Sequence, residues 1–137
     1  MAFVVGSVAA LRITGPQYTS SVQAQPPQFG VVTVAGVLVE DVLWPDGHVE
    51  AAIPDAGLDE LLSPDPANVT RIQGRYVRHT PGGSSNSDST GFDGYVVMLY
   101  KRAPGGGAAG PDKALVRTQT GFYMEFLASE LAVVPGN

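Results

Sequence analysis

The stretch VLVEDVLWPDGHVEAAIPDAGL, residues 37–58, decides the fold class. Both of its arms are rich in apolar and β-branched residues, and a Trp-Pro-Asp-Gly turn lies between them. Pro45 fixes its own φ angle, and Asp46 and Gly47 tolerate the positive φ angles that tight hairpins require. Residues 37–44 and 48–53 are therefore predicted to form a β-hairpin around that turn.

Strand signals continue in both directions from this hairpin. They cover residues 2–13, where Gly6-Ser7 interrupts them, and then 31–34, 69–79, 92–102 and a second hairpin over 113–134. The continuous apolar run at 95–100 predicts a central strand buried on both faces, whereas 54–62 holds at most two turns of helix. No window has sustained helical spacing, so the prediction is an all-β chain, a compact antiparallel β-barrel or sandwich.

Three segments lack strand signals and are rich in Gly, Pro, Ser or Gln. Residues 15–30 contain Pro26-Pro27, which favours extended backbone, and are predicted to form a long loop or an arm that lies across a neighbour. Residues 80–90 and 103–111 are predicted to be flexible loops. Long loops in compact domains are uncommon and tend to be functional.

Composition sets the size and the chemical class of the protein. Its 137 residues fit a single domain over residues 1–137, long enough for a core of its own. Charged residues make up only 15 % of the chain, against about 25 % in ordinary globular proteins. A weakly charged surface suits contact with other proteins.

Charge and cysteine content exclude several classes of function. The net charge of −5 opposes nucleic acid as the main partner, because phosphate binding needs clustered cations. With no cysteine, the chain has no disulfide, no thiolate metal site and no cysteine nucleophile. The N-terminus lacks the pattern of a signal peptide and no run approaches ~20 apolar residues. We therefore expect a cytoplasmic or virion protein with no membrane contact.

Two stretches share a local plan. Residues 37–58 and 115–131 both contain a strand, a Gly turn and a second strand, and each ends in a short helical turn that leads to a leucine, Leu58 or Leu131. This plan resembles the last strands of small SH3-like barrels, although any β protein can contain such hairpins. The resemblance covers these two stretches only. It implies a barrel whose ends the leucines close, and it implies no ligand, because Trp44 stands alone.

The residues that could support catalysis form no recognisable constellation. His48 could pair with Asp41, Asp46 or Glu50 as a base and its orienting group, but an exposed polar strand face is the simpler interpretation. His79 opens a predicted loop, and neither histidine has zinc-site spacing. Ser84, Ser85 and Ser87 lie outside any nucleophile elbow. We therefore predict a chain that is not an enzyme, with no catalytic, cofactor-binding or metal-binding residues.

Two further motifs have simpler structural explanations. Asp88 and Asp93 flank a Gly/Ser-rich stretch but lack the alternating oxygen ligands of a Ca²⁺ loop. Arg75-Tyr76-Val77-Arg78 interleaves cations with an aromatic ring, as single-strand nucleic-acid binders do. An edge strand with Tyr76 packed and the arginines solvated explains the same pattern and is favoured.

The sequence thus favours a non-enzymatic structural or assembly protein. Low charge, a long arm and flexible loops are common in subunits of viral or phage-type particles, whose arms order against neighbouring subunits. Its expected partners are proteins, either copies of itself or other subunits. An SH3-like regulatory module that binds a peptide or nucleic acid is the alternative.

Overall fold

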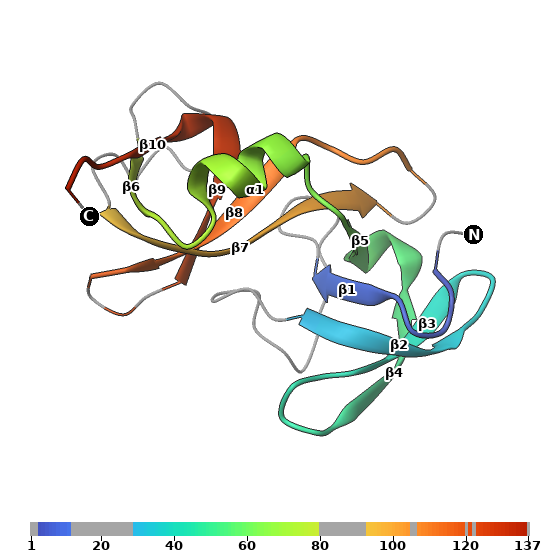
Figure 1. Ribbon diagram of the computed structural model, residues 1–137. Helices are drawn as coiled ribbons and strands as arrows, with labels where there is room; N and C mark the ends of the chain where they lie inside the picture. Colours follow the sequence, from blue (N-terminus) through green and yellow to red (C-terminus); the bar gives the residue numbers. More distant parts are fainter. Residues whose placement is uncertain are drawn as a thin grey trace. The chain divides into compact units, whose positions relative to one another are not determined.

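The computed structural model describes residues 3–11, 29–79, 93–104, 107–119, 121 and 123–136. Within these residues the chain is mainly antiparallel β-strand, which confirms the all-β prediction (Figure 1). Residues 15–28 of the predicted arm and the whole predicted loop 80–90 lie outside the described residues. The chain divides into two compact units, Met1–Leu62 with Arg102–Gly110 and Ser63–Lys101 with Pro111–Asn137. The prediction of a single β domain over residues 1–137 stays a prediction.

The first unit is a five-stranded antiparallel arrangement with the order β5-β1-β2-β3-β4. Its elements are β1 (Val8–Leu11), β2 (Phe29–Ala35), β3 (Val39–Leu43), β4 (Val49–Pro54), the 3₁₀ turn η1 (Asp55–Gly57) and β5 (Leu58–Leu62). β5 has a second neighbour in β7, whose last residues belong to this unit. The buried core consists of Phe3, Ala9, Leu11, Val32, Val42, Trp44, Ile53 and Leu58.

The second unit has the corresponding order β10-β6-β7-β8-β9. It begins with α1 (Pro66–Ile72), followed by β6 (Tyr76–His79), β7 (Asp93–Pro104), β8 (Asp112–Thr118), β9 (Tyr123–Leu127), the 3₁₀ turn η3 (Ala128–Glu130) and β10 (Leu131–Val133). Its core is separate from the first and contains Ile72, Val77, Val96, Leu99, Ala114, Val116, Phe126, Ala128 and Leu131.

The two units repeat one local design in detail. In both, a 3₁₀ turn ends at a buried leucine that starts the closing strand, Leu58 in one and Leu131 in the other. The hairpins and helical turns that the sequence predicts in both stretches are therefore present. The similarity of the two units also includes strands outside the two stretches that share a plan in the sequence. β2 and β7 each contain a glycine, Gly30 or Gly94, packed closely against the next strand, and each has a register shift just beyond it.

Several predicted boundaries are wrong, for local reasons. α1 was missed, and residues 69–72, predicted as strand, are helical. Asp65 caps the helix by accepting a hydrogen bond from the Ala67 N–H at 2.9 Å, and Pro66 begins it. Seven residues are too few to show helical periodicity.

Other corrections concern the extent and the burial of the strands. Residues 58–62, predicted as part of a short helix, form β5 because they pair with β1. Phe29 and Gly30 belong to β2, and the first two residues of the predicted loop 103–111 end β7. The run 95–100 does lie in a strand with neighbours on both sides, but Tyr95 and Val97 are exposed rather than buried.

The turn of the first hairpin provides a test of local backbone conformation. Gly47 has a φ of +95°, as predicted, and its N–H donates to the Trp44 carbonyl at 2.9 Å. A Cβ added there would meet no atom within 4 Å. The Gly47→Val substitution should therefore act through backbone strain alone and lower the free energy of unfolding by about 1–2 kcal/mol.

Urea unfolding followed by Trp44 fluorescence measures this loss. Gly47→Asn is the matched control, because asparagine tolerates positive φ better than a β-branched residue. It should cost clearly less than valine. Equal losses for the two variants, or no loss for valine, would contradict the turn conformation.

Candidate ligand-binding site

Four large side chains form a row across four strands of the second unit. In the sheet register Tyr76 of β6 is opposite Tyr95 of β7, and Tyr95 is opposite Arg117 of β8. Arg117 is in turn opposite Tyr123 of β9. Directly opposed residues of antiparallel strands place their side chains on one face. We call these four residues the tyrosine row.

Strand alternation decides which way the tyrosine row faces. The neighbouring residues Val77, Val96 and Val116 are buried in the core of the second unit, so the row occupies the opposite face. A Cβ at Gly94 would lie 2.3 Å from the Arg117 carbonyl oxygen. Glycine at this position thus lets β7 and β8 approach closely beside the row.

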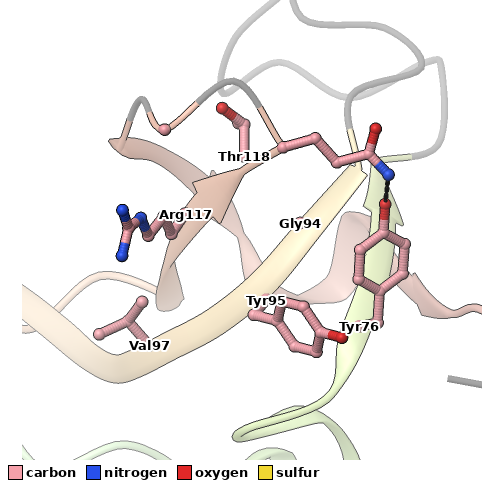
Figure 2. Close-up of a pocket in the computed structure, with 8 residues that line it drawn as sticks. Tyr76, Gly94, Tyr95, Val97, Arg117 and Thr118 are labelled. Carbon is pink, nitrogen blue, oxygen red and sulfur yellow. Dashed lines mark hydrogen bonds between the residues drawn. The ribbon is translucent and has the colours of Figure 1, made fainter.

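An open pocket of about 460 Å³ lies at one end of the row. The rings of Tyr76 and Tyr95 meet edge to face, with centroids 4.9 Å apart and planes at 75°. Figure 2 shows these rings next to each other, with Val97 and Arg117 on the other side of the view. The side-chain amide of Gln119 donates to the Tyr76 hydroxyl. The lining residues are Tyr76, Gly94, Tyr95, Val97, Arg117, Thr118, Gln119 and Gly121.

The row offers aromatic surface and one available cation. Tyr95 is 54 % exposed, whereas Tyr76 is buried beneath its neighbours. The Arg117 guanidinium lies 5.9 Å from the centre of the Tyr123 ring, a cation–π contact. Within the part of the chain that the structure describes, Arg117 has no carboxylate partner in an ion pair. Its charge is therefore available to a ligand.

The neighbouring arginine is not available. Arg78 Nε and Nη2 donate to the two oxygens of Asp93, at 2.7 and 2.9 Å. The hydrogen bond from Arg78 lowers the pKa of Asp93, and the Asp93 carboxylate raises the pKa of Arg78. The prediction that Tyr76 is packed is confirmed, but that of an edge strand is wrong, because β6 pairs with both β7 and β10.

The residues around the first predicted histidine have structural partners. Asp46 accepts from the His48 backbone N–H at 3.1 Å, and this hydrogen bond lowers the pKa of Asp46. Glu50 instead accepts from the Trp44 indole N–H at 3.1 Å, and Asp41 accepts from the Ala52 N–H at 2.9 Å. Of the predicted pairs, the structure brings His48 and Asp46 together: His48 Nδ1 lies 2.5 Å from Asp46 Oδ1, and the two side chains are 38 and 66 % exposed.

The second histidine is part of the core. His79 is 2 % exposed, stacks on Phe126 at a centroid distance of 4.5 Å, and its Nε2 lies 2.8 Å from Glu130 Oε1. His79 lies opposite Leu131 in the sheet register of the second unit. At the corresponding position of the first unit, Leu11 lies opposite Leu58. His79 thus takes the place of an apolar core residue of the other unit, and its burial keeps it from acting on a substrate.

The structure also brings together two carboxyl groups that the sequence did not connect. Glu40 of β3 is 1 % exposed and interacts with Asp55 at the start of η1. Burial is the main cause that raises the pKa of Glu40 to about 8, and the neighbouring Asp55 carboxyl adds to the shift. Paired carboxyls can catalyse hydrolysis in a cleft, but this Glu40 is sealed from solvent.

Other chemistry finds little support in the described residues. No group of three or more His, Asp or Glu side chains among them could hold a metal ion. Asp93 pairs with Arg78, while Asp88 and the serines at 84, 85 and 87 lie outside the described residues. None of the described helices is long and apolar enough to cross a membrane.

Comparison with known proteins gave no match. No family model, no curated protein and no solved structure was significantly similar to this chain. Interpretation of the site therefore depends on its own geometry.

Sequence reasoning missed three members of the tyrosine row. It singled out Tyr76 but not Tyr95, Arg117 or Tyr123. One signal was present: Arg117 and Tyr123 lie symmetrically about the predicted turn near Gly121, and such residues face each other across a hairpin. The pairing of Tyr76 with Tyr95 spans the residues 80–92 between β6 and β7, and no sequence pattern specified it.

Proposed function

We propose that the chain is a non-enzymatic structural or assembly protein, such as a component of a viral or phage-type particle, that acts through contacts between its copies. The observation that supports this function is a row of exposed aliphatic side chains on the first unit. Exposed apolar surface of this kind is typical of protein interaction sites.

This aliphatic row runs across four strands. Val8 is opposite Val31, Val31 is opposite Leu43, and Leu43 is opposite Val49. Their exposed fractions are 40, 42, 38 and 54 % in that order. The neighbouring residues Ala9, Val32 and Val42 fill the core of the first unit. The row thus presents apolar side chains to solvent that the unit's own core does not use.

A second copy of the chain suits this surface. The row contains no charged residue, so two copies of it can meet about a two-fold axis without opposing like charges. Further aliphatic side chains of the same unit are exposed as well, namely Val34, Val37, Leu38 and Val39. Burial of such residues would supply free energy of association from the hydrophobic effect.

A positive charge placed in the aliphatic row tests whether copies of the chain associate through it. Val31→Lys would bring two lysines together in a two-fold contact. We expect sedimentation at rising concentration to show a wild-type oligomer, and the variant to raise its dissociation constant at least ~10-fold, because each lost valine contact contributes about 1.5 kcal/mol or more. Val69→Lys is the matched control, since Val69 is 37 % exposed on α1. A wild-type chain that stays monomeric at high concentration would contradict the proposal.

An SH3-like regulatory binding module is the second candidate function. The strand arrangement of both units supports it. In each unit the fifth strand along the chain pairs with the first, and a 3₁₀ turn directly precedes the fifth strand. On this proposal each unit is a small SH3-like barrel, and the pocket beside the tyrosine row takes the ligand. A monomer that binds a peptide or nucleic acid would favour this candidate.

A further inference from the structure

We propose that the pocket beside the tyrosine row binds the Pro26-Pro27 segment of a second copy of the chain. This inference rests on the proposed function, the association of copies, and names a second contact for it. The site lies wholly in the second unit, whereas the aliphatic row lies in the first. The two contacts can therefore be tested separately.

The walls of the pocket suit proline rings. Tyr95 is half exposed, Tyr76 meets it edge to face, and Val97 is 46 % exposed beside them. A Pro-Pro pair favours the polyproline II conformation, whose preformed shape loses little entropy on binding. Aromatic-lined surfaces bind such segments because proline rings pack against the flat faces of aromatic side chains. The pocket thus supplies apolar surface of the right kind.

The polar groups of the pocket suit the same ligand. Neither proline has an N–H, so a Pro-Pro pair presents only hydrogen-bond acceptors, and its carbonyls have no internal partners. Arg117 has five N–H donors and no acceptor. The Tyr76 hydroxyl already accepts from Gln119, so its own proton is the group that it can offer to a ligand. Arg117 and the Tyr76 hydroxyl, which both line the pocket, are therefore donors that suit the carbonyls of such a ligand.

The charge pattern favours this segment over nucleic acid. The sequence contains one Pro-Pro pair, and residues 13–39 around it include no charged side chain. The segment itself has no negative charge for the acceptor chain, whose net charge is −5, to repel. A nucleic acid would meet that repulsion, and Arg117, the one cation among the residues that line the pocket, could neutralise only one of its phosphates.

The position of the segment determines the geometry of assembly. Gln28 alone separates Pro27 from Phe29, the first residue of β2, so the donor segment is tied to the first unit. The acceptor pocket belongs to the second unit. A contact between different surfaces of identical chains is head-to-tail, and it produces a ring or an open filament.

The ligand in the experiment is a labelled peptide of residues 20–28. The receptor is the full chain carrying Pro26→Ser and Pro27→Ser, because its own segment then cannot compete with the peptide for the pocket. Fluorescence polarisation should show saturable binding below about 1 mM. Adding Tyr95→Ala to the receptor should weaken binding at least ~10-fold, whereas Tyr95→Phe, which keeps the ring, should not. A peptide with both prolines replaced by serine should fail to bind.

The inference would be overturned by the absence of saturable binding, by binding insensitive to Tyr95→Ala, or by preferential binding of a ten-nucleotide thymidine oligomer that depends on Arg117. A mixing experiment separates contacts between chains from contacts within one chain. With Val31→Lys added to both chains to remove the contact through the aliphatic row, the Tyr95→Ala chain and the double proline variant each lack one half of the proline contact, so together they should form a 1:1 complex in sedimentation. Absence of this complex would also count against the proposal. Loss of peptide binding with persistence of the Val31-sensitive oligomer would leave the proposed function standing.

Discussion

Replacing Arg102 by methionine is expected to lower the free energy of unfolding by about 3–5 kcal/mol. Arg102 is 8 % exposed, and its Nη1 donates to the Leu11 carbonyl at 2.9 Å and to Asp59 Oδ2 at 3.3 Å. Methionine fills similar space but leaves the buried Asp59 carboxylate without this cation. Removing the cation from a buried ion pair has a far larger energetic cost than the loss of an exposed ion pair.

Urea unfolding followed by Trp44 fluorescence gives the measurement, because Trp44 is the single tryptophan and lies in the core of the first unit. Arg78→Met is the matched control. Its partner Asp93 is also an aspartate, but the Arg78 side chain is 59 % exposed, so the loss should stay below about 1 kcal/mol. Adding Asp59→Leu to Arg102→Met should recover much of the stability. Equal losses for Arg102→Met and Arg78→Met would contradict the buried pair.

The stability of the first unit is expected to fall as pH rises from about 4.5 to about 8. The Glu40 pKa is raised from 4.5 to about 8 in the folded chain, so folding favours the protonated carboxyl. The contribution is fully present below the unfolded pKa and is lost as pH rises through the folded pKa. With about 1.4 kcal/mol per pH unit, the loss between pH 4.5 and pH 7 is roughly 3 kcal/mol.

Glu40→Gln tests this dependence, because glutamine keeps the shape and cannot ionise. Thermal or urea unfolding of both proteins at several pH values, again followed by Trp44, gives the difference between their stability curves. We expect the variant to gain on the wild type as pH rises. Parallel curves for wild type and Glu40→Gln would show that Glu40 does not take up a proton on folding.

Local chemistry made the hairpins predictable. The Pro45-Asp46-Gly47 turn, the strands on either side of it and the two short turns that end at Leu58 and Leu131 could all be predicted, because proline, glycine and β-branched side chains restrict the backbone wherever they occur. The same reasoning failed for α1 and β5. A seven-residue helix and a five-residue strand carry too little pattern, and their pairing and packing partners are distant in the chain.

The candidate site was predictable only in part. Tyr76 could be named from Arg75-Tyr76-Val77-Arg78, but the site exists because strands from three separate parts of the chain align in one register. Arg78 was an equally good candidate in sequence, yet Asp93 neutralises it, while Arg117 keeps its charge available. Only the partners of each cation decide which one a ligand can use.

The sequence by itself determined an all-β chain, the positions of its tight turns and the absence of cysteine chemistry, since these follow from residue type and local backbone preference. The sequence also showed the shared plan of two stretches, but the tertiary structure alone decided that they belong to two units with separate cores. It also decided that aliphatic side chains occupy the exposed row of the first unit, whereas aromatic side chains and an arginine occupy that of the second. The physical reason is that strand pairing between distant segments, which no local pattern encodes, brings together the side chains that share a face.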